Sequence, residues 1–134
     1  MRYLGIDFGL KRTGVAVSDA DGRIAVIKET IDVVGQQQII DRIKAILEEE
    51  KNIDAIVIGM PLNMKGEGTE MTSEVERFVA KLRNHVSVPV QTYDERLTTE
   101  MAHTLLRGVT QEKRDQVAAQ IILQNFLDGL ANKV

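Results

Sequence analysis

The stretch that decides the fold is the first fourteen residues, Met1-Arg-Tyr-Leu-Gly-Ile-Asp-Phe-Gly-Leu-Lys-Arg-Thr-Gly14. An apolar, β-prone run over residues 3–8 is interrupted by one carboxylate, Asp7, and is followed by glycine. Side chains alternate along a strand, so Asp7 would share a face with Tyr3 and Gly5. A carboxylate in such a run is costly to bury without a partner. Asp7 is therefore either a charge that caps a turn, or a metal ligand or catalytic acid at the carboxyl end of a central strand.

Composition restricts the class of protein. A chain of 134 residues is expected to form one domain, 1–134, with a real core. The hydrophobic share of 43% includes no run long enough to span a bilayer, and no signal peptide precedes the first strand, so we expect a soluble, cytoplasmic protein. The absence of cysteine excludes disulfides and thiolate metal sites. A net charge of −3 argues against binding nucleic acid through bulk positive charge, but it allows a local basic patch.

The remaining pattern predicts the element order β-β-β-α-β-α-β-α-α. Strands are expected over residues 3–8, 13–18, 23–31, 52–58 and 86–93. Helices are expected over 35–51, from 69 onward, over 99–107 and over 111–128, with a loop at 59–68. An Asp-Gly turn at 21–22 makes the first three strands an antiparallel meander. A meander followed by βα units gives an α/β fold with a five-stranded mixed sheet and helices on its faces.

Asp115 lies near the start of the last expected helix. Residues three, four, seven and eleven positions later share its face, and these are Ala118, Ala119, Ile122 and Phe126. Asp115 is therefore expected on the apolar stripe that faces the sheet. The alternative is that it merely favours the positive end of the helix dipole. That role explains its position along the helix but not around it.

Two further acids, Asp94 and Glu95, follow the fifth expected strand. The alternatives here are turn initiation for Asp94 and an ion pair with Arg96 for Glu95. Three carboxylates brought to one edge of a sheet from separate segments repel one another unless a divalent cation holds them. Oxygen-rich ligation of this kind suits Mg²⁺ or Mn²⁺. A pair of such ions about 3.5–4 Å apart can promote cleavage of a phosphodiester bond.

Basic residues accompany these acids, whereas acidic residues crowd the two middle helices. The net charge of −3 is therefore compatible with one face that binds a phosphate backbone, although solvated helix ends would explain each base singly. The candidates for nucleic-acid binding are Lys11, Arg12, Lys65, Arg96, Lys113 and Arg114.

Five segments together resemble one family nearly from end to end. They are Gly5-Ile-Asp-Phe-Gly9, Arg12-Thr-Gly-Val-Ala-Val-Ser18, Gly59-Met-Pro61, Asp94-Glu-Arg-Leu-Thr-Thr99 and Ala118-Ala-Gln-Ile-Ile-Leu-Gln-Asn-Phe-Leu127. The chain resembles the YqgF/RuvX family, bacterial proteins described as pre-16S rRNA nucleases and earlier as Holliday junction resolvases.

The resemblance implies a ribonuclease H-like fold, a cytoplasmic location and divalent-metal nuclease chemistry in rRNA processing. Carried over by motif, the catalytic and metal-binding acids would be Asp7, Glu95 and Asp115, with Asp94 a fourth candidate. Many ribonuclease H-like enzymes have an acid at the end of the fourth strand, where this chain has Gly59-Met-Pro61. Glu95 would then supply the missing ligand from the fifth strand.

Four functions remain open on the sequence alone. The first is a Mg²⁺- or Mn²⁺-dependent endonuclease that matures precursor rRNA on the ribosome or a pre-ribosomal particle. The second is a Holliday junction resolvase acting on branched DNA, which normally requires a two-fold dimer rather than a monomer. The third is a non-catalytic nucleic-acid-binding module. The fourth, a phosphate loop of the actin or hexokinase kind, would need a second such domain, so we assign the glycines to backbone approach and tight turning instead.

Overall fold

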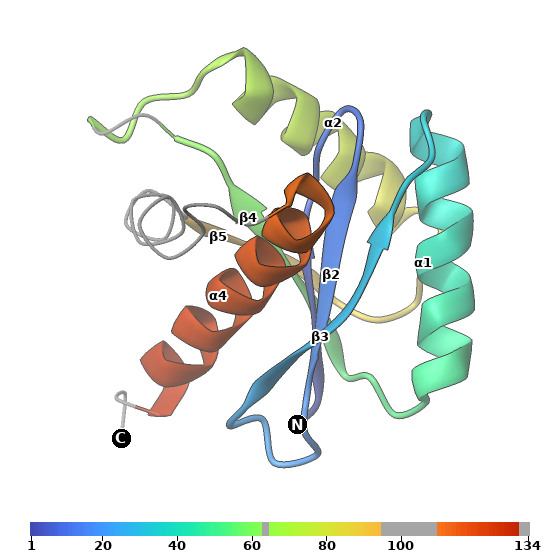
Figure 1. The fold of residues 1–134 in the computed structure, drawn as a ribbon, viewed down its shortest axis with the longest axis vertical. Helices are drawn as coiled ribbons and strands as arrows, with labels where there is room; N and C mark the ends of the chain where they lie inside the picture. The colour runs from blue at the N-terminus through green and yellow to red at the C-terminus, as the bar shows by residue number, and fades with distance from the viewer. Residues whose placement is uncertain (63–64, 95–109, 132–134) are drawn as a thin grey trace.

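The computed structural model describes residues 1–62, 65–94 and 110–131 (Figure 1). The strands are β1 (Tyr3–Asp7), β2 (Thr13–Ser18), β3 (Ala25–Ile31), β4 (Ala55–Met60) and β5 (Val90–Asp94). The helices are α1 (Gln36–Glu50), α2 (Glu70–Arg83) and α4 (Gln111–Ala131). The element order agrees with the prediction over these residues. The helix expected over 99–107 lies outside them. Among the helices described, none is long and apolar enough to cross a membrane.

The five strands form one mixed sheet in the order β3-β2-β1-β4-β5. β1 pairs antiparallel with β2 and parallel with β4, and β4 pairs parallel with β5. The mixed sheet, the antiparallel meander and the central place of β1 are therefore confirmed. The end of β1 lies where antiparallel pairing gives way to parallel pairing, so a residue there is flanked by strands on both sides.

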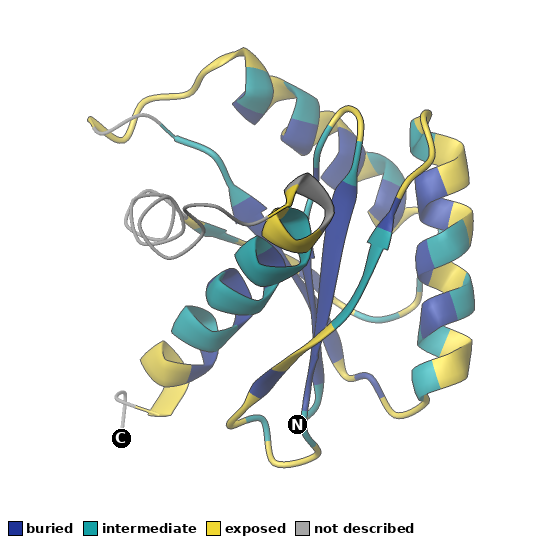
Figure 2. Cartoon of the chain, viewed as in Figure 1, coloured by how far each residue is buried: buried dark blue, intermediate teal, exposed yellow. Residues whose placement is uncertain are grey.

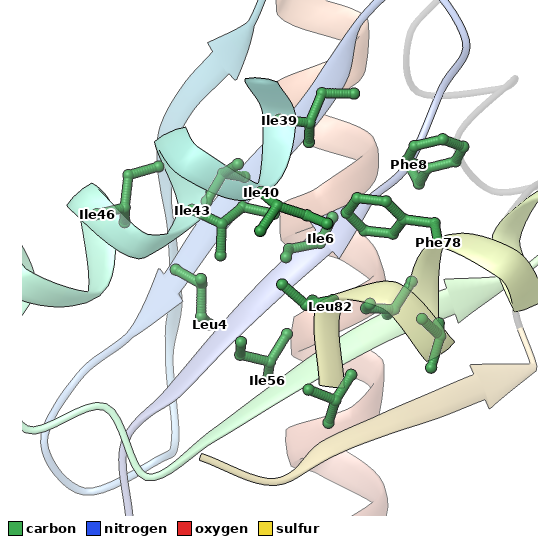
Figure 3. Packing of buried hydrophobic residues seen from close by; sticks show 14 of the residues in the cluster. Leu4, Ile6, Phe8, Ile39, Ile40, Ile43, Ile46, Ile56, Phe78 and Leu82 are labelled. Carbon is green, nitrogen blue, oxygen red and sulfur yellow. The ribbon is translucent and has the colours of Figure 1, made fainter. Parts of the chain in front are cut away.

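Large apolar side chains fill the face of the sheet that α1 and α2 cover (Figure 3). Helix α1 presents Ile39, Ile40, Ile43 and Ile46 to this face, each at most 2% exposed. The dark blue stripe of buried residues along α1 in Figure 2 follows this 3.6-residue period. Burying each such side chain stabilises the fold by about 1.5–3 kcal/mol, an upper estimate because the unfolded chain is partly compact. This face therefore supplies most of the core.

Helix α4 crosses the opposite face of the sheet (Figure 1). The strand residues of the cluster there include three alanines as well as Tyr3 and Val57. Ala16, Ala25 and Ala55 line this face and are buried. A Cβ on Gly5 would lie only 2.7 Å from Leu123 Cβ, which is closer than real Cβ atoms approach. α4 therefore packs against the sheet at short range, and the position of its side chains depends on how little the strands project.

Several predicted boundaries were wrong, each for a local reason. β3 begins at Ala25 rather than at residue 23, because the Asp19 carboxylate accepts hydrogen bonds from the backbone N–H groups of Arg23 (2.8 Å) and Ile24 (3.1 Å) and prolongs the turn. These bonds also lower the pKa of Asp19. β4 begins at residue 55 rather than 52, because Lys51 and Asn52 have φ of 54° and 58° and interrupt the extended chain.

The two ends of the parallel half of the sheet also differ from the prediction. β4 continues to Met60, two residues into the expected loop, because it keeps pairing with β5 up to Asp94. β5 begins at Val90 rather than at residue 86, immediately after Pro89, whose ring leaves no N–H for the ladder. β5 is an edge strand of the sheet, a position that tolerates proline. α4 continues to residue 131, three residues past its predicted end.

Candidate active site

Asp7 is the last residue of β1 and faces α4. Its neighbours Ile6 and Phe8 both point into the cluster under α1 and α2, so alternation places Asp7 on the other face. In the antiparallel β1–β2 ladder its partner is Gly14. The side chain is half-buried, since α4 covers this region only in part. The sequence-based placement of Asp7 at the carboxyl end of a central strand is correct.

Gly14 is the point at which α4 touches the sheet beside Asp7. A Cβ on Gly14 would lie 1.8 Å from the backbone carbonyl oxygen of Asp115 and 2.5 Å from its carbonyl carbon. No residue other than glycine fits this contact without movement of the helix. Cross-strand partners in an antiparallel pair have Cα atoms only about 4.5–5.5 Å apart. The backbone of Asp115 therefore lies against the direct neighbour of Asp7, although the two acids are far apart in the sequence.

Arg12 forms an ion pair with Asp115. Its Nε donates a hydrogen bond to Asp115 Oδ2 at 3.1 Å, and the two side chains are 34% and 17% exposed. The loop that carries Arg12 is closed by Thr13, whose hydroxyl lies 3.4 Å from the Gly9 N–H and 3.5 Å from the Gly9 carbonyl oxygen. The arginine that the sequence assigned to phosphate binding is thus placed on a carboxylate.

Of the two acids predicted near the end of β5, the structure describes only Asp94. Asp94 pairs with Met60, which packs on the cluster under α1 and α2, whereas the preceding Tyr93 packs on the cluster under α4. Asp94 therefore lies on the face opposite to Asp7. Glu95 and Arg96 lie outside the described residues, and their predicted roles stay predictions.

The remaining predicted bases are all exposed. Lys11 follows β1 in the β1–β2 loop, and Lys113 and Arg114 lie in the first turn of α4, next to Asp115. The ion pair between Arg12 and Asp115 joins these two segments. The three bases therefore lie together with Arg12 at one end of the sheet. Lys65 belongs to the segment between β4 and α2, where an isolated bridge pairs Leu62 with Gly68. Figure 1 shows that segment at the upper left, farther from α4.

The donor set suits a hard divalent cation. Asp7 and Asp115 supply carboxylate oxygens, the ligands that Mg²⁺ and Mn²⁺ prefer. Over residues 1–62, 65–94 and 110–131 no group of three or more His, Cys, Asp or Glu side chains is arranged to hold a metal. The third acid of the predicted set is Glu95, which those ranges leave out. Of the three predicted ligands, Asp7 and Asp115 are joined through Gly14, which pairs with Asp7 and contacts the Asp115 backbone.

Two features of this site were not foreseen from the sequence. The glycines of the first hairpin were assigned to backbone approach, but Asp115 was not identified as what approaches Gly14. The alternation of small and large residues in Gly14-Val-Ala-Val17 is the signal that could have found it, because it marks a strand face that lies close to another backbone. The ion pair between Arg12 and Asp115 had no such signal, because its two residues are 103 positions apart.

The strand order and the position of α4 across one face of the sheet define a ribonuclease H-like fold of the kind found in resolvases and nucleases. The Thermus thermophilus RuvC structure is similar at a TM-score of 0.61 and 16% identity, covering 98% of this chain and 97% of that one. The fowlpox virus resolvase bound to a Holliday junction is similar at a TM-score of 0.56 and 12% identity, with 97% and 99% covered. At these identities the likeness establishes the fold.

The sequence itself establishes the family. Residues 1–129 match the family RuvX, described as Holliday junction resolvase, and the chain belongs to this family. A protein of Chloroflexus aggregans is 40% identical over 96% of this chain and 94% of its own length. One of Geobacillus thermodenitrificans is 43% identical over 96% and 99%. Both are named "Putative pre-16S rRNA nuclease".

Proposed function

We propose that this protein is a divalent-metal-dependent nuclease that hydrolyses phosphodiester bonds at the ends of precursor 16S rRNA. The observation that supports the proposal is the contact between Gly14 and the Asp115 backbone, because Gly14 is the cross-strand partner of Asp7 at the end of the central strand. A merely structural role for Asp115 would not require its backbone to lie so close to that particular pair of strands.

In this proposal Asp7, Asp115 and Glu95 hold Mg²⁺ or Mn²⁺. Glu95 is preferred to Asp94, because Asp94 lies on the face under α1 and α2. When bound, the metal lowers the pKa of water and neutralises charge on the phosphate. The carboxylates would fix the position of the ion, and the half-buried setting of Asp7 and Asp115 strengthens the electrostatic interaction relative to bulk water.

The basic residues at the same end of the sheet bind the backbone of the substrate. Lys11, Lys113 and Arg114 are exposed, which is the setting that a contact with substrate phosphates requires. Lys65 and Arg96 remain candidates for further phosphate contacts. Because the chain has a net charge of −3, its affinity for nucleic acid should depend on salt through these few contacts.

The choice of substrate follows from the relatives. The bacterial proteins that match along nearly their whole length carry a name that refers to pre-16S rRNA. We accordingly propose that the protein acts in the cytoplasm, where pre-ribosomal particles are its partners, as a monomer or homodimer.

The test is the substitution Asp7→Asn, which keeps the shape of the side chain and removes its charge. Cleavage of an RNA carrying the precursor 16S 5′ end, in Mn²⁺, should fall by roughly 100-fold or more, since a metal ligand is lost. The matched control is Asp128→Asn, an exposed residue at the far end of α4 that bonds only to Gln124 among the contacts described. Cleavage by folded Asp7→Asn protein at the rate of the control would refute the proposal.

The second candidate is a resolvase that acts on branched DNA. The family description and the similarity to the fowlpox resolvase–junction complex favour it. It predicts paired, symmetric cuts in a four-way junction and a two-fold dimer in solution. Junction cleavage faster than RNA cleavage, by a protein that sediments as a dimer, would favour this candidate over the first. A protein that binds no Mn²⁺ would instead indicate a non-catalytic binding module.

A further inference from the structure

The ion pair between Arg12 and Asp115 involves a carboxylate that the proposed function assigns to metal. Arg12 Nε lies 3.1 Å from Asp115 Oδ2 and donates a hydrogen bond to it. The guanidinium carries a positive charge. A divalent cation on the same carboxylate would be repelled by this charge and would compete for the same oxygen lone pairs.

The loop holds Arg12 in place by its backbone. The Thr13 hydroxyl bridges the N–H and carbonyl oxygen of Gly9, and a Cβ on Gly9 would lie 2.2 Å from the Arg12 carbonyl oxygen. The chain therefore turns back on itself tightly between Gly9 and Thr13. Because the backbone is fixed in this way, Arg12 can leave Asp115 by rotating its side chain, which is 34% exposed.

The neighbouring bases show where the side chain would go. Lys11 precedes Arg12 in the same loop, and Lys113 and Arg114 precede Asp115 on α4. A phosphate held by these exposed bases would offer Arg12 an alternative partner of opposite charge. Arginine binds phosphate through two parallel N–H groups, as it binds carboxylate.

We propose that Arg12 is a positioning residue that occupies Asp115 in the metal-free protein and transfers to a phosphate of the nucleic acid when the metal binds. The inference rests on the proposed function, since it takes Asp115 to be a metal ligand. In this proposal Arg12 couples the binding of the metal to the binding of the nucleic acid. Metal binding frees Arg12 for the substrate, and the substrate, by reciprocity, strengthens metal binding.

The first measurement is calorimetric titration of Mn²⁺ into the protein without nucleic acid. The Arg12→Gln variant should bind Mn²⁺ roughly three- to tenfold more tightly than the wild type, because the competing cation is gone. Lys11→Gln removes a charge from the same loop but not the ion pair, and should change the affinity less than twofold. Arg12→Lys keeps the charge and loses the planar fork, so an intermediate affinity is expected. Thermal melting verifies that each variant is folded.

The second measurement is the salt dependence of binding to a labelled single-stranded RNA, in EDTA and in Ca²⁺, another cation that takes oxygen ligands. In Ca²⁺, Arg12→Gln should reduce the slope of log K against log[salt] by about one, the loss of one phosphate contact. In EDTA its slope should equal that of the wild type. Lys11→Gln should reduce the slope equally in both conditions.

The outcomes separate this inference from the proposed function. Equal or weaker Mn²⁺ binding by Arg12→Gln, or a slope that falls equally with and without Ca²⁺, would overturn the role of Arg12. The proposed metal site would survive that result if Asp7→Asn still abolished Mn²⁺ binding. A wild-type protein that binds no Mn²⁺ would remove both.

Discussion

Replacing Gly14 by alanine tests the contact on which the candidate site depends. The new methyl group would lie 1.8 Å from the Asp115 carbonyl oxygen, whereas real Cβ atoms essentially never approach closer than 3.0 Å, so α4 or β2 must shift by about 1.2 Å. The atom in the way belongs to the backbone of a helix, so no side-chain rotation relieves the clash. Overpacking of this kind typically costs about 1–3 kcal/mol. We place Gly14→Ala at the upper end, at about 2–3 kcal/mol.

This loss should leave the protein folded. A domain of 134 residues has a free energy of unfolding on the order of 5–15 kcal/mol. With an unfolding entropy of about 2.1 cal/mol/K per residue, a loss of 2–3 kcal/mol lowers Tm by roughly 7–10 °C. The displaced helix would carry the Asp115 carboxylate away from Asp7. Mn²⁺ affinity, measured by calorimetry well below Tm, should therefore fall by roughly tenfold or more, since a shift near 1 Å disrupts ligand geometry.

The matched control is Gly129→Ala on the same helix. A Cβ there meets nothing within 4 Å, and alanine is the better helix former, so this variant should be up to about 1 kcal/mol more stable and bind Mn²⁺ as the wild type does. If Gly14→Ala matched that control in both Tm and Mn²⁺ affinity, α4 would not lie on Gly14. The proposed pairing of Asp7 with Asp115 would then be wrong.

Two further predictions concern regions away from the site. Thr72→Val should lower the free energy of unfolding by about 1–3 kcal/mol in chemical denaturation. The reason is that the buried hydroxyl of Thr72 accepts a hydrogen bond from the Thr69 N–H (2.9 Å) and donates one to the Pro61 carbonyl oxygen. A loss no larger than that of Thr72→Ser, which keeps the hydroxyl, would contradict this. A hydrogen bond from Arg42 lowers the pKa of the Glu49 carboxyl below its ordinary value of 4.5. The contribution of this ion pair to stability is therefore present above pH 4.5 and disappears as the pH falls through the lowered pKa. Glu49→Gln should therefore be less stable than the wild type at neutral pH and equal to it in acid, and the difference should shrink in an Arg42→Gln background; a difference independent of pH would count against the ion pair.

The sheet could be predicted because its physical signals are local. The first strand, the Asp-Gly turn and the alternation over 13–18 predict the antiparallel meander without reference to the rest of the chain. The apolar stripe of α1 is complete within one segment, and all four of its buried isoleucines belong to it. The boundary errors arose where a side chain bonds to the backbone, as at Asp19, or where the backbone enters the left-handed region, as at Lys51. Neither effect is visible in hydrophobic periodicity.

The site was predictable only as a set of residue types. The positions of Asp7 and Asp115 in the apolar pattern, at a strand end and on an inward helix face, indicated that both carboxylates point inward. Their approach depends on which strand α4 crosses and at what height, and this is decided by the packing of Leu123 on Gly5 and of the α4 backbone on Gly14. The pairing of Asp94 with Met60 is a matter of register, because a shift of one residue would move it to the other face.

The contrast between the two faces of the sheet explains how a helix can bring a carboxylate to a strand end. Under α1 and α2 the strands present leucine, isoleucine, valine and phenylalanine, and side chains of this size hold the helix backbones away from the sheet. Where α4 approaches most closely the strands present Gly5 and Gly14, with alanines nearby, and the helix backbone itself touches β2. A short side chain such as aspartate reaches a neighbouring strand only from a helix at that distance. Small residues lower the stability of the strands. They also let α4 approach the sheet closely, so that the short side chain of Asp115 is held more firmly than a longer acid on a more distant helix would be.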